Sequence, residues 1–216
     1  MDKVALSNIS IADIPEDKLV SRILADRLWG SEFFQFADMP SGMVNRKCVR
    51  LETAPGKPRG DIDILFCAPD LPQRAVAYQV KRIKFGITHV RNEVPGKLGE
   101  FEKLVRQANL LARMGFWQVY AAVFVVVDAR ELNAGKVTYQ GLPSRMRSLI
   151  SSAISPQFLD ERVGLGVLEF TQPMDYVPLT IGTQKLNIGR FAKSATQSEE
   201  LTKWVRDIFS NPEQPI

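Results

Sequence analysis

Residues 60–85 read GDIDILFCAPDLPQRAVAYQVKRIKF, and this stretch decides the fold. Two runs within it alternate apolar and polar residues, one around Ile64 and one around Val80. Such alternation is typical of β-strands whose two faces meet different surroundings. Between the runs, residues 68–73 contain the Pro and Asp residues that favour turns. The stretch therefore predicts two antiparallel strands joined by a short connection, with Asp70 at the tip of the turn.

The register of these strands predicts a polar cluster. If the hairpin is centred near Leu71, opposed residues have numbers that sum to 142, so Asp63 lies opposite Gln79 and Asp61 opposite Lys81. All four numbers are odd, so the four side chains leave the same face of the sheet. The apolar residues leave the other face, towards a core: Ile62, Ile64, Tyr78 and Val80. The other interpretation is an ordinary solvated hairpin face with mixed charges.

The remaining elements follow from apolar spacing and from turn residues. Helices are predicted over 14–29, 98–112 (ending at Gly115), 142–154 and 198–209, and strands over 43–52, 116–127 and 164–170. The run at 116–127, FWQVYAAVFVVV, favours a central strand buried on both faces. No element is assigned to 171–194. The order helix, strand, strand, strand, helix, strand predicts an α/β fold with a mixed central sheet flanked by helices and with additional C-terminal helices.

Length and composition limit the class of protein. The 216 residues predict a single domain over 1–216, with a core at about 14–128 and a C-terminal elaboration at about 129–216. No apolar run reaches about 18 residues and the N-terminus lacks a secretory pattern, so we expect no membrane span and a cytoplasmic location. Two Cys and one His exclude a four-ligand zinc site of His and Cys.

Positive charge is concentrated around the hairpin. Residues 46–97 contain eleven Lys and Arg against five acids, a net charge of +6 in a chain whose total is +4. A basic collar around an acidic pocket suits a polyanionic partner such as nucleic acid. The competing interpretation is that these Lys and Arg residues only keep exposed strands soluble.

The Asp at the start of a strand, the hairpin and the sequence Gln79-Val80-Lys81 resemble the PD-(D/E)XK nuclease superfamily. The Q-x-K motif is similar to that of the Mrr-type branch, and the resemblance covers roughly 14–128. It implies a restriction-endonuclease-like core (αβββαβ) and metal-dependent hydrolysis of phosphodiester bonds, with DNA as the expected substrate. The implied setting is restriction, defence or repair.

The resemblance also implies roles for individual residues. Asp63 and Gln79 would hold Mg²⁺ or Mn²⁺, and Lys81 would be the catalytic lysine. Glu16 matches the acid that some members carry on the first helix, with Asp26 as a competitor, and Asp61 resembles an accessory acid. Basic residues near the hairpin would contact nucleic acid: Arg59, Arg82, Lys84 and Arg91. Mg²⁺ keeps several of its waters, so few protein oxygens are needed.

Two departures from the family pattern leave other functions open. Gln79 stands where the usual member has Glu, and the chain has no evident DNA-reading module. The alternative is a non-catalytic nucleic-acid-binding or assembly subunit that retains the nuclease-like fold. A protein-interaction module, in which the hairpin cluster is only structural, is a third hypothesis. Recognition of a specific sequence would have to come from loops, from a partner or from the region after Ala129. The expected protein partner is a second copy of the chain, in a homodimer, or a recognition subunit.

Overall fold

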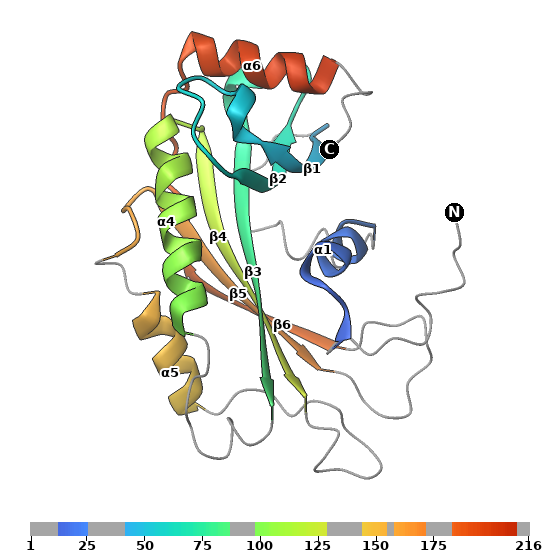
Figure 1. The fold of residues 1–216 in the computed structure, drawn as a ribbon, viewed down its shortest axis with the longest axis vertical. Helices are drawn as coiled ribbons and strands as arrows, with labels where there is room; N and C mark the ends of the chain where they lie inside the picture. The colour runs from blue at the N-terminus through green and yellow to red at the C-terminus, as the bar shows by residue number, and fades with distance from the viewer. Residues whose placement is uncertain are drawn as a thin grey trace.

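The computed structural model describes residues 13–25, 42–86, 98–128, 144–154, 158–171 and 183–210. Helices, strands and two short 3-10 helices (η) follow one another along the chain as shown in Figure 1: α1 (Glu16–Ala25), β1 (Val44–Arg50), η2 (Leu51–Thr53), β2 (Asp61–Cys67), η3 (Pro72–Arg74), β3 (Val76–Gly86), α4 (Leu98–Met114), β4 (Gln118–Asp128), α5 (Ser144–Ala153), β5 (Val163–Thr171), β6 (Thr183–Arg190) and α6 (Glu199–Ser210). The predicted order from the first helix to the central strand is confirmed.

The six strands form one mixed sheet in the order β1-β2-β3-β4-β5-β6. The three central strands β3, β4 and β5 run parallel, and every other neighbouring pair is antiparallel. The predicted mixed sheet flanked by helices is therefore confirmed. Within the described ranges, the helices are too short or too polar for any of them to cross a membrane.

Helices cover both faces of the sheet (Figure 1). On one face the strands pack with α4, α5 and α6, which bury Phe101, Leu104, Leu111, Met146, Ile150, Leu201 and Val205. On the other face they pack with α1, which buries Leu19, Val20 and Ile23. The sequence placed Ile62 on the same side as Ile64, but Ile62 packs in the α4 cluster and Ile64 in the α1 cluster. The difference arises because β2 turns away from β3 just before Ile64.

The central position of β4 follows from its composition. All of its residues are buried except Asp128 at its end, as expected for an inner strand of a sheet covered on both faces. The preceding helix α4 stops at Met114, and Gly115 follows with φ +86°. Glycine adopts this left-handed conformation without the steric cost of a Cβ, so it ends the helix and turns the chain into β4.

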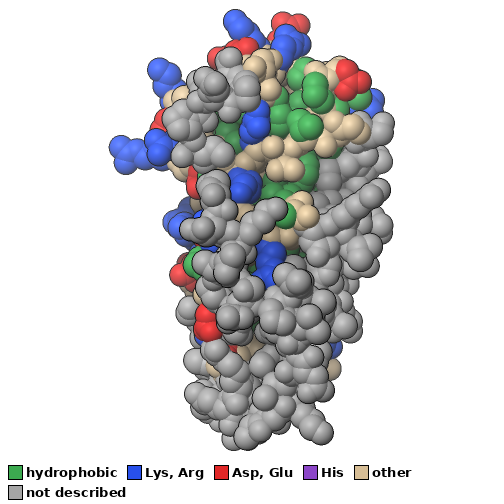
Figure 2. Space-filling model, turned by 90° about the vertical axis from the view of Figure 1, so that its right-hand side faces the viewer, with side chains coloured by type: hydrophobic (Ala, Val, Ile, Leu, Met, Phe, Trp, Pro, Cys, Tyr) green, Lys and Arg blue, Asp and Glu red, His purple; other side chains and the backbone are tan. Residues whose placement is uncertain are grey.

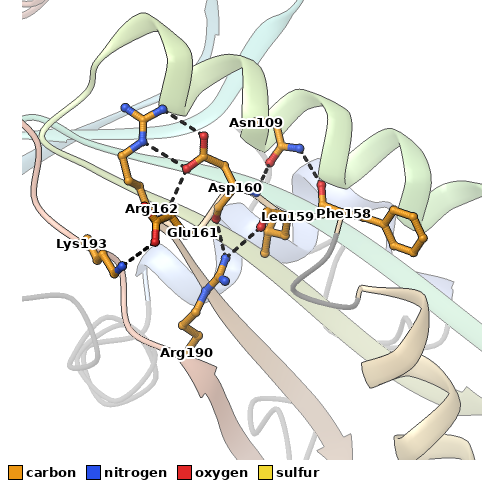
Figure 3. Close-up of polar contacts among 8 residues, drawn as sticks. All are labelled: Asn109, Phe158, Leu159, Asp160, Glu161, Arg162, Arg190 and Lys193. Carbon is orange, nitrogen blue, oxygen red and sulfur yellow. Dashed lines mark hydrogen bonds and ion pairs between the residues drawn. The ribbon is translucent and has the colours of Figure 1, made fainter.

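Strand β6 lies in the region to which the sequence assigned no element. Its last residue anchors it: the Arg190 guanidinium donates to the Val163 carbonyl oxygen at 2.8 Å and to that of Asp160. The side chain of Asp160 pairs with Arg162, and its backbone N–H donates to Asn109 of α4 (Figure 3). These contacts fix the chain reversal before β5 against both α4 and β6. Hydrogen bonds of this long-range kind leave no periodic signal in a sequence.

Candidate functional site

Strands β2 and β3 separate beside the predicted polar cluster. Their recorded pairs run from Ile64 opposite Tyr78 to Phe66 opposite Val76, so paired numbers sum to 142 and the predicted register is confirmed. Before Ile64 the two strands no longer pair, while β3 continues to Gly86 along β4. The N–H groups on this edge of β3 therefore need acceptors other than β2.

Asp63 supplies the first of these acceptors. Its Oδ2 accepts a hydrogen bond from the Val80 N–H at 2.6 Å and a second one from Gln79 Nε2, also at 2.6 Å. A carboxylate oxygen thus replaces the carbonyl that β2 would have offered. Asp63 and Gln79 are therefore in contact through their side chains, but the predicted strand pairs of Asp63 with Gln79 and of Asp61 with Lys81 are not formed, because β2 and β3 no longer pair there.

Glu16, in the first turn of α1, supplies the second acceptor. Its Oε2 accepts the N–H of Arg82, two residues beyond Val80 and on the same edge of the strand. This contact connects the start of α1 to β3. It also brings a second carboxylate to the point where β2 and β3 separate. The predicted helical acid therefore lies beside the cluster.

Lys81 lies between two acids that belong to different helices. Its Nζ is 2.9 Å from Glu100 Oε2 on α4 and 3.8 Å from Glu16 Oε2 on α1. Burial by itself lowers the pKa of Lys81, but the hydrogen bond to Glu100 and the charges of Glu16, Glu100 and Asp63 outweigh it, and the pKa lies above its ordinary value. Lys81 is therefore a cation throughout the neutral pH range.

The pKa of Asp63 is raised from 3.8 to about 7. Burial is the main cause, and the charges of Asp61 and Glu16 add to it. The Val80 N–H and the Lys81 ammonium act in the opposite direction and only partly compensate. A carboxyl group held in this way favours either a proton or a cation beside it.

Gln79 has one polar atom without a partner. The residue is 3% exposed and its Nε2 donates to Asp63, but its buried Oε1 has no hydrogen-bond partner in the described part of the chain. A buried oxygen in this state costs about 1–3 kcal/mol, so native proteins usually satisfy it. Its neighbour is a carboxyl group, which suggests that a cation or a proton belongs here.

A cleft of about 410 Å³ opens beside these groups, between α1 and strands β1 and β2. Its lining is Glu16, Asp17, Lys18, Val20, Ser21, Lys47, Cys48, Asp61 and Asp63. Lys47 Nζ donates to Ser21 Oγ at 2.6 Å, which connects β1 to α1 across the cleft. Figure 2 views the α1 side of the molecule and shows several Lys and Arg side chains along the upper half, beside a group of hydrophobic ones.

Cys48 lies opposite Asp63, between the paired residues Lys47 and Val49 of β1. Its φ is +52°, an uncommon conformation for a residue with a side chain, with a strain of about 1–3 kcal/mol. Burial, followed by the charges of Asp63 and Asp61, raises the pKa of its thiol. Cys48 therefore stays protonated at neutral pH, which argues against a cysteine nucleophile here.

The residues present suit an ion that needs few protein ligands. Among the described residues, no three His, Cys, Asp or Glu side chains lie close enough together to form a metal cage. Asp63 and Gln79 are different, because a carboxyl group of raised pKa adjoins an amide group with an orphaned oxygen. Oxygens of these two types, completed by water and phosphate, fit Mg²⁺ or Mn²⁺.

The other predicted site residues have different surroundings. Asp61 lines the cleft beside Asp63, Arg82 is half-buried and Arg59 is exposed. Lys84 Nζ forms ion pairs with Asp13 at 3.2 Å and Asp128 at 3.1 Å, so its charge is already compensated. Arg91 and Asp26 lie outside the described residues, and Asp70 is exposed at the turn as predicted.

Sequence reasoning missed Glu100, Lys47 and Cys48. Glu100 stands in the first turn of a predicted helix, where acids are common for local reasons, so only the contact with Lys81 singles it out. Lys47 and Cys48 lie on the expected first strand, without a motif around them. A comparison with protein-family models finds no match to the chain, and a comparison with curated proteins finds none either.

Proposed function

We propose that the protein is a metal-dependent nuclease that hydrolyses phosphodiester bonds, most readily in DNA, on a restriction-endonuclease-like core. The observation that carries the proposal is the contact between Asp63 and Gln79 where β2 leaves β3, with the Lys81 charge acting on Asp63 and with Asp63 lining an open cleft. The order α1 β1 β2 β3 α4 β4 is compatible with the αβββαβ core of the PD-(D/E)XK superfamily. The strained Cys48 beside Asp63 supports a functional site, because strain of this kind clusters at such sites.

In this proposal Asp63 and Gln79 hold a Mg²⁺ or Mn²⁺ ion. When bound, the ion supplies a more acidic water and offsets the negative charge of the substrate phosphate. Binding of the ion would satisfy Gln79 Oε1 and would favour the ionised form of Asp63, so the site relieves two unfavourable features of the metal-free protein.

Lys81 contributes a positive charge next to the reacting phosphate. Its ammonium has three N–H donors and is anchored on one side by Glu100. An N–H that does not face Glu100 can bind a phosphate oxygen and stabilise the charge that develops there. Glu16 connects this lysine to the cleft, because it lies near Lys81 Nζ and also lines the cavity.

Cleavage of supercoiled plasmid DNA tests the proposal. The wild-type protein should nick or linearise the plasmid in Mg²⁺ or Mn²⁺ and be inactive in EDTA. Asp63→Asn and Lys81→Ala should each lower the rate by on the order of 100-fold or more, while Asp70→Asn, an exposed turn variant, should keep it. A Lys81→Ala variant with full activity would refute the mechanism.

The non-catalytic nucleic-acid-binding subunit is the second candidate, and the neutral Gln79 in place of the usual carboxylate favours it. It predicts binding of DNA that weakens steeply with salt. It also predicts no cleavage in any divalent metal. The plasmid assay and a salt titration of DNA binding, made on the same preparation, separate the two functions.

A further inference from the structure

Glu100 reaches Lys81 from the side of the sheet opposite to α1. It stands in the first turn of α4, and α4 packs on the other face from α1 (Figure 1). Its Oε2 lies 2.9 Å from Lys81 Nζ, whereas Glu16 Oε2 lies 3.8 Å away. Only the first distance is that of a charge-assisted hydrogen bond.

The two glutamates differ in their other contacts. Glu16 accepts the Arg82 N–H and lines the cleft, so it belongs to the proposed binding site itself. Glu100 does not contribute to the lining of the cleft. Lys81 does not line the cleft either, but its Nζ lies 3.8 Å from Glu16, which does. The contact with Lys81 is therefore one route by which Glu100 can affect a substrate in the cleft.

We infer that Glu100 is a positioning residue, which holds the Lys81 ammonium in place for the proposed hydrolysis; this inference rests on the proposed function. A lysine side chain has four flexible carbon–carbon bonds, and fixing its end costs conformational entropy. A hydrogen bond to Glu100 fixes that end before a substrate arrives. An ammonium group that is already oriented increases the rate of hydrolysis, because a displacement of a catalytic group by about 1 Å can lower the rate on the order of 100-fold.

The Lys81 side chain is only 22% exposed, so its contact with Glu100 is partly shielded from water. Loss of the Glu100 carboxylate should therefore leave the Lys81 ammonium less well ordered.

The test compares Glu100→Gln with Glu102→Gln. Glu102 is exposed two residues further along the same helix, so its variant controls for loss of one acid from α4. In plasmid cleavage with Mg²⁺, Glu100→Gln should lower kcat by on the order of 10-fold to 100-fold with little change in KM. Glu100→Asp, which keeps the charge on a shorter side chain, should fall between Glu100→Gln and the wild type, and Glu102→Gln should match the wild type.

A second measurement does not depend on cleavage. NMR relaxation of protein with ¹³C-labelled lysine, with the Lys81 signal assigned from Lys81→Arg, should show a more mobile Lys81 Cε in Glu100→Gln than in the wild type. Unchanged mobility of Lys81, or an unchanged kcat in an active enzyme, would overturn the inference and leave the proposed function standing. A wild-type protein that cleaves no substrate in any metal would overturn the proposed function, and the role of Glu100 in hydrolysis with it.

Discussion

Asp63→Asn should make the metal-free protein more stable at pH 8 than the wild type. The ionised Asp63 is disfavoured by burial and by the neighbouring Asp61 and Glu16. The side-chain amide is nearly isosteric and neutral. Both hydrogen bonds to Asp63 end on the same atom, Oδ2, so one amide oxygen can accept both of them.

The size of the effect follows from the pKa of Asp63, which is about 7 in the folded protein against an ordinary value of 3.8. The folded state holds the proton more tightly than the unfolded state, so the wild type loses stability as the pH rises from about 4 to about 7. About three pKa units at 1.36 kcal/mol each give an upper limit of about 4 kcal/mol. Asp63→Asn cannot ionise at this position and escapes this loss.

Urea unfolding followed by Trp fluorescence in EDTA measures the difference. We expect the two proteins to differ little at pH 4, and the variant to be more stable by about 2–4 kcal/mol at pH 8. Asp70→Asn should stay within about 0.5 kcal/mol of the wild type at both pH values, because Asp70 is exposed at the turn. A constant difference between wild type and Asp63→Asn from pH 4 to pH 8 would refute the reasoning.

Two further variants probe the site and the fold. Gln79→Glu places a carboxylate where the amide now donates to Asp63 at 2.6 Å, so in EDTA at pH 8 we expect a loss of about 1–3 kcal/mol in the free energy of unfolding and a larger stabilisation by Mg²⁺ than in the wild type. Urea titrations with and without Mg²⁺ measure both effects, and wild-type behaviour in both would contradict the proposed ligand pair. Gly164→Ala would put a Cβ against the buried Tyr120 ring and 2.7 Å from the Ala192 nitrogen, so we expect a loss of about 3 kcal/mol or more. In Gly189→Ala the closest contacts are the Leu165 side chain at 3.3 Å and its carbonyl oxygen at 3.6 Å, so the loss should be less than about 1 kcal/mol. Equal losses in both variants would contradict the packing argument.

Local patterns in the sequence predicted much of this fold. The alternation around Ile64 and Val80 gave the correct hairpin register, and the apolar run before Asp128 gave the buried central strand. Gly115 predicted the end of α4, because the left-handed backbone conformation at that point is one that glycine adopts readily. Each of these features depends on residues close together in the chain.

Features that depend on distant residues were not predictable in the same way. The separation of β2 from β3 reverses the side on which Ile62 packs, and no residue in the hairpin signals it. Strand β6 is held by Arg190 against a turn about 30 residues earlier. The contact of Glu100 with Lys81 likewise joins two elements whose relative placement only the folded sheet determines.

The carboxylates of Asp63 and Glu16 do more than furnish negative charge, because they also close an open sheet edge. They accept hydrogen bonds from the Val80 and Arg82 N–H groups. Without them, these N–H groups would be available to an extended segment of a neighbouring molecule. Alanine at either position would remove the charge and expose a donor at the same time. Self-association of such a variant would then mimic a loss of activity, whereas asparagine at position 63 and glutamine at position 16 keep the acceptor and isolate the role of the charge.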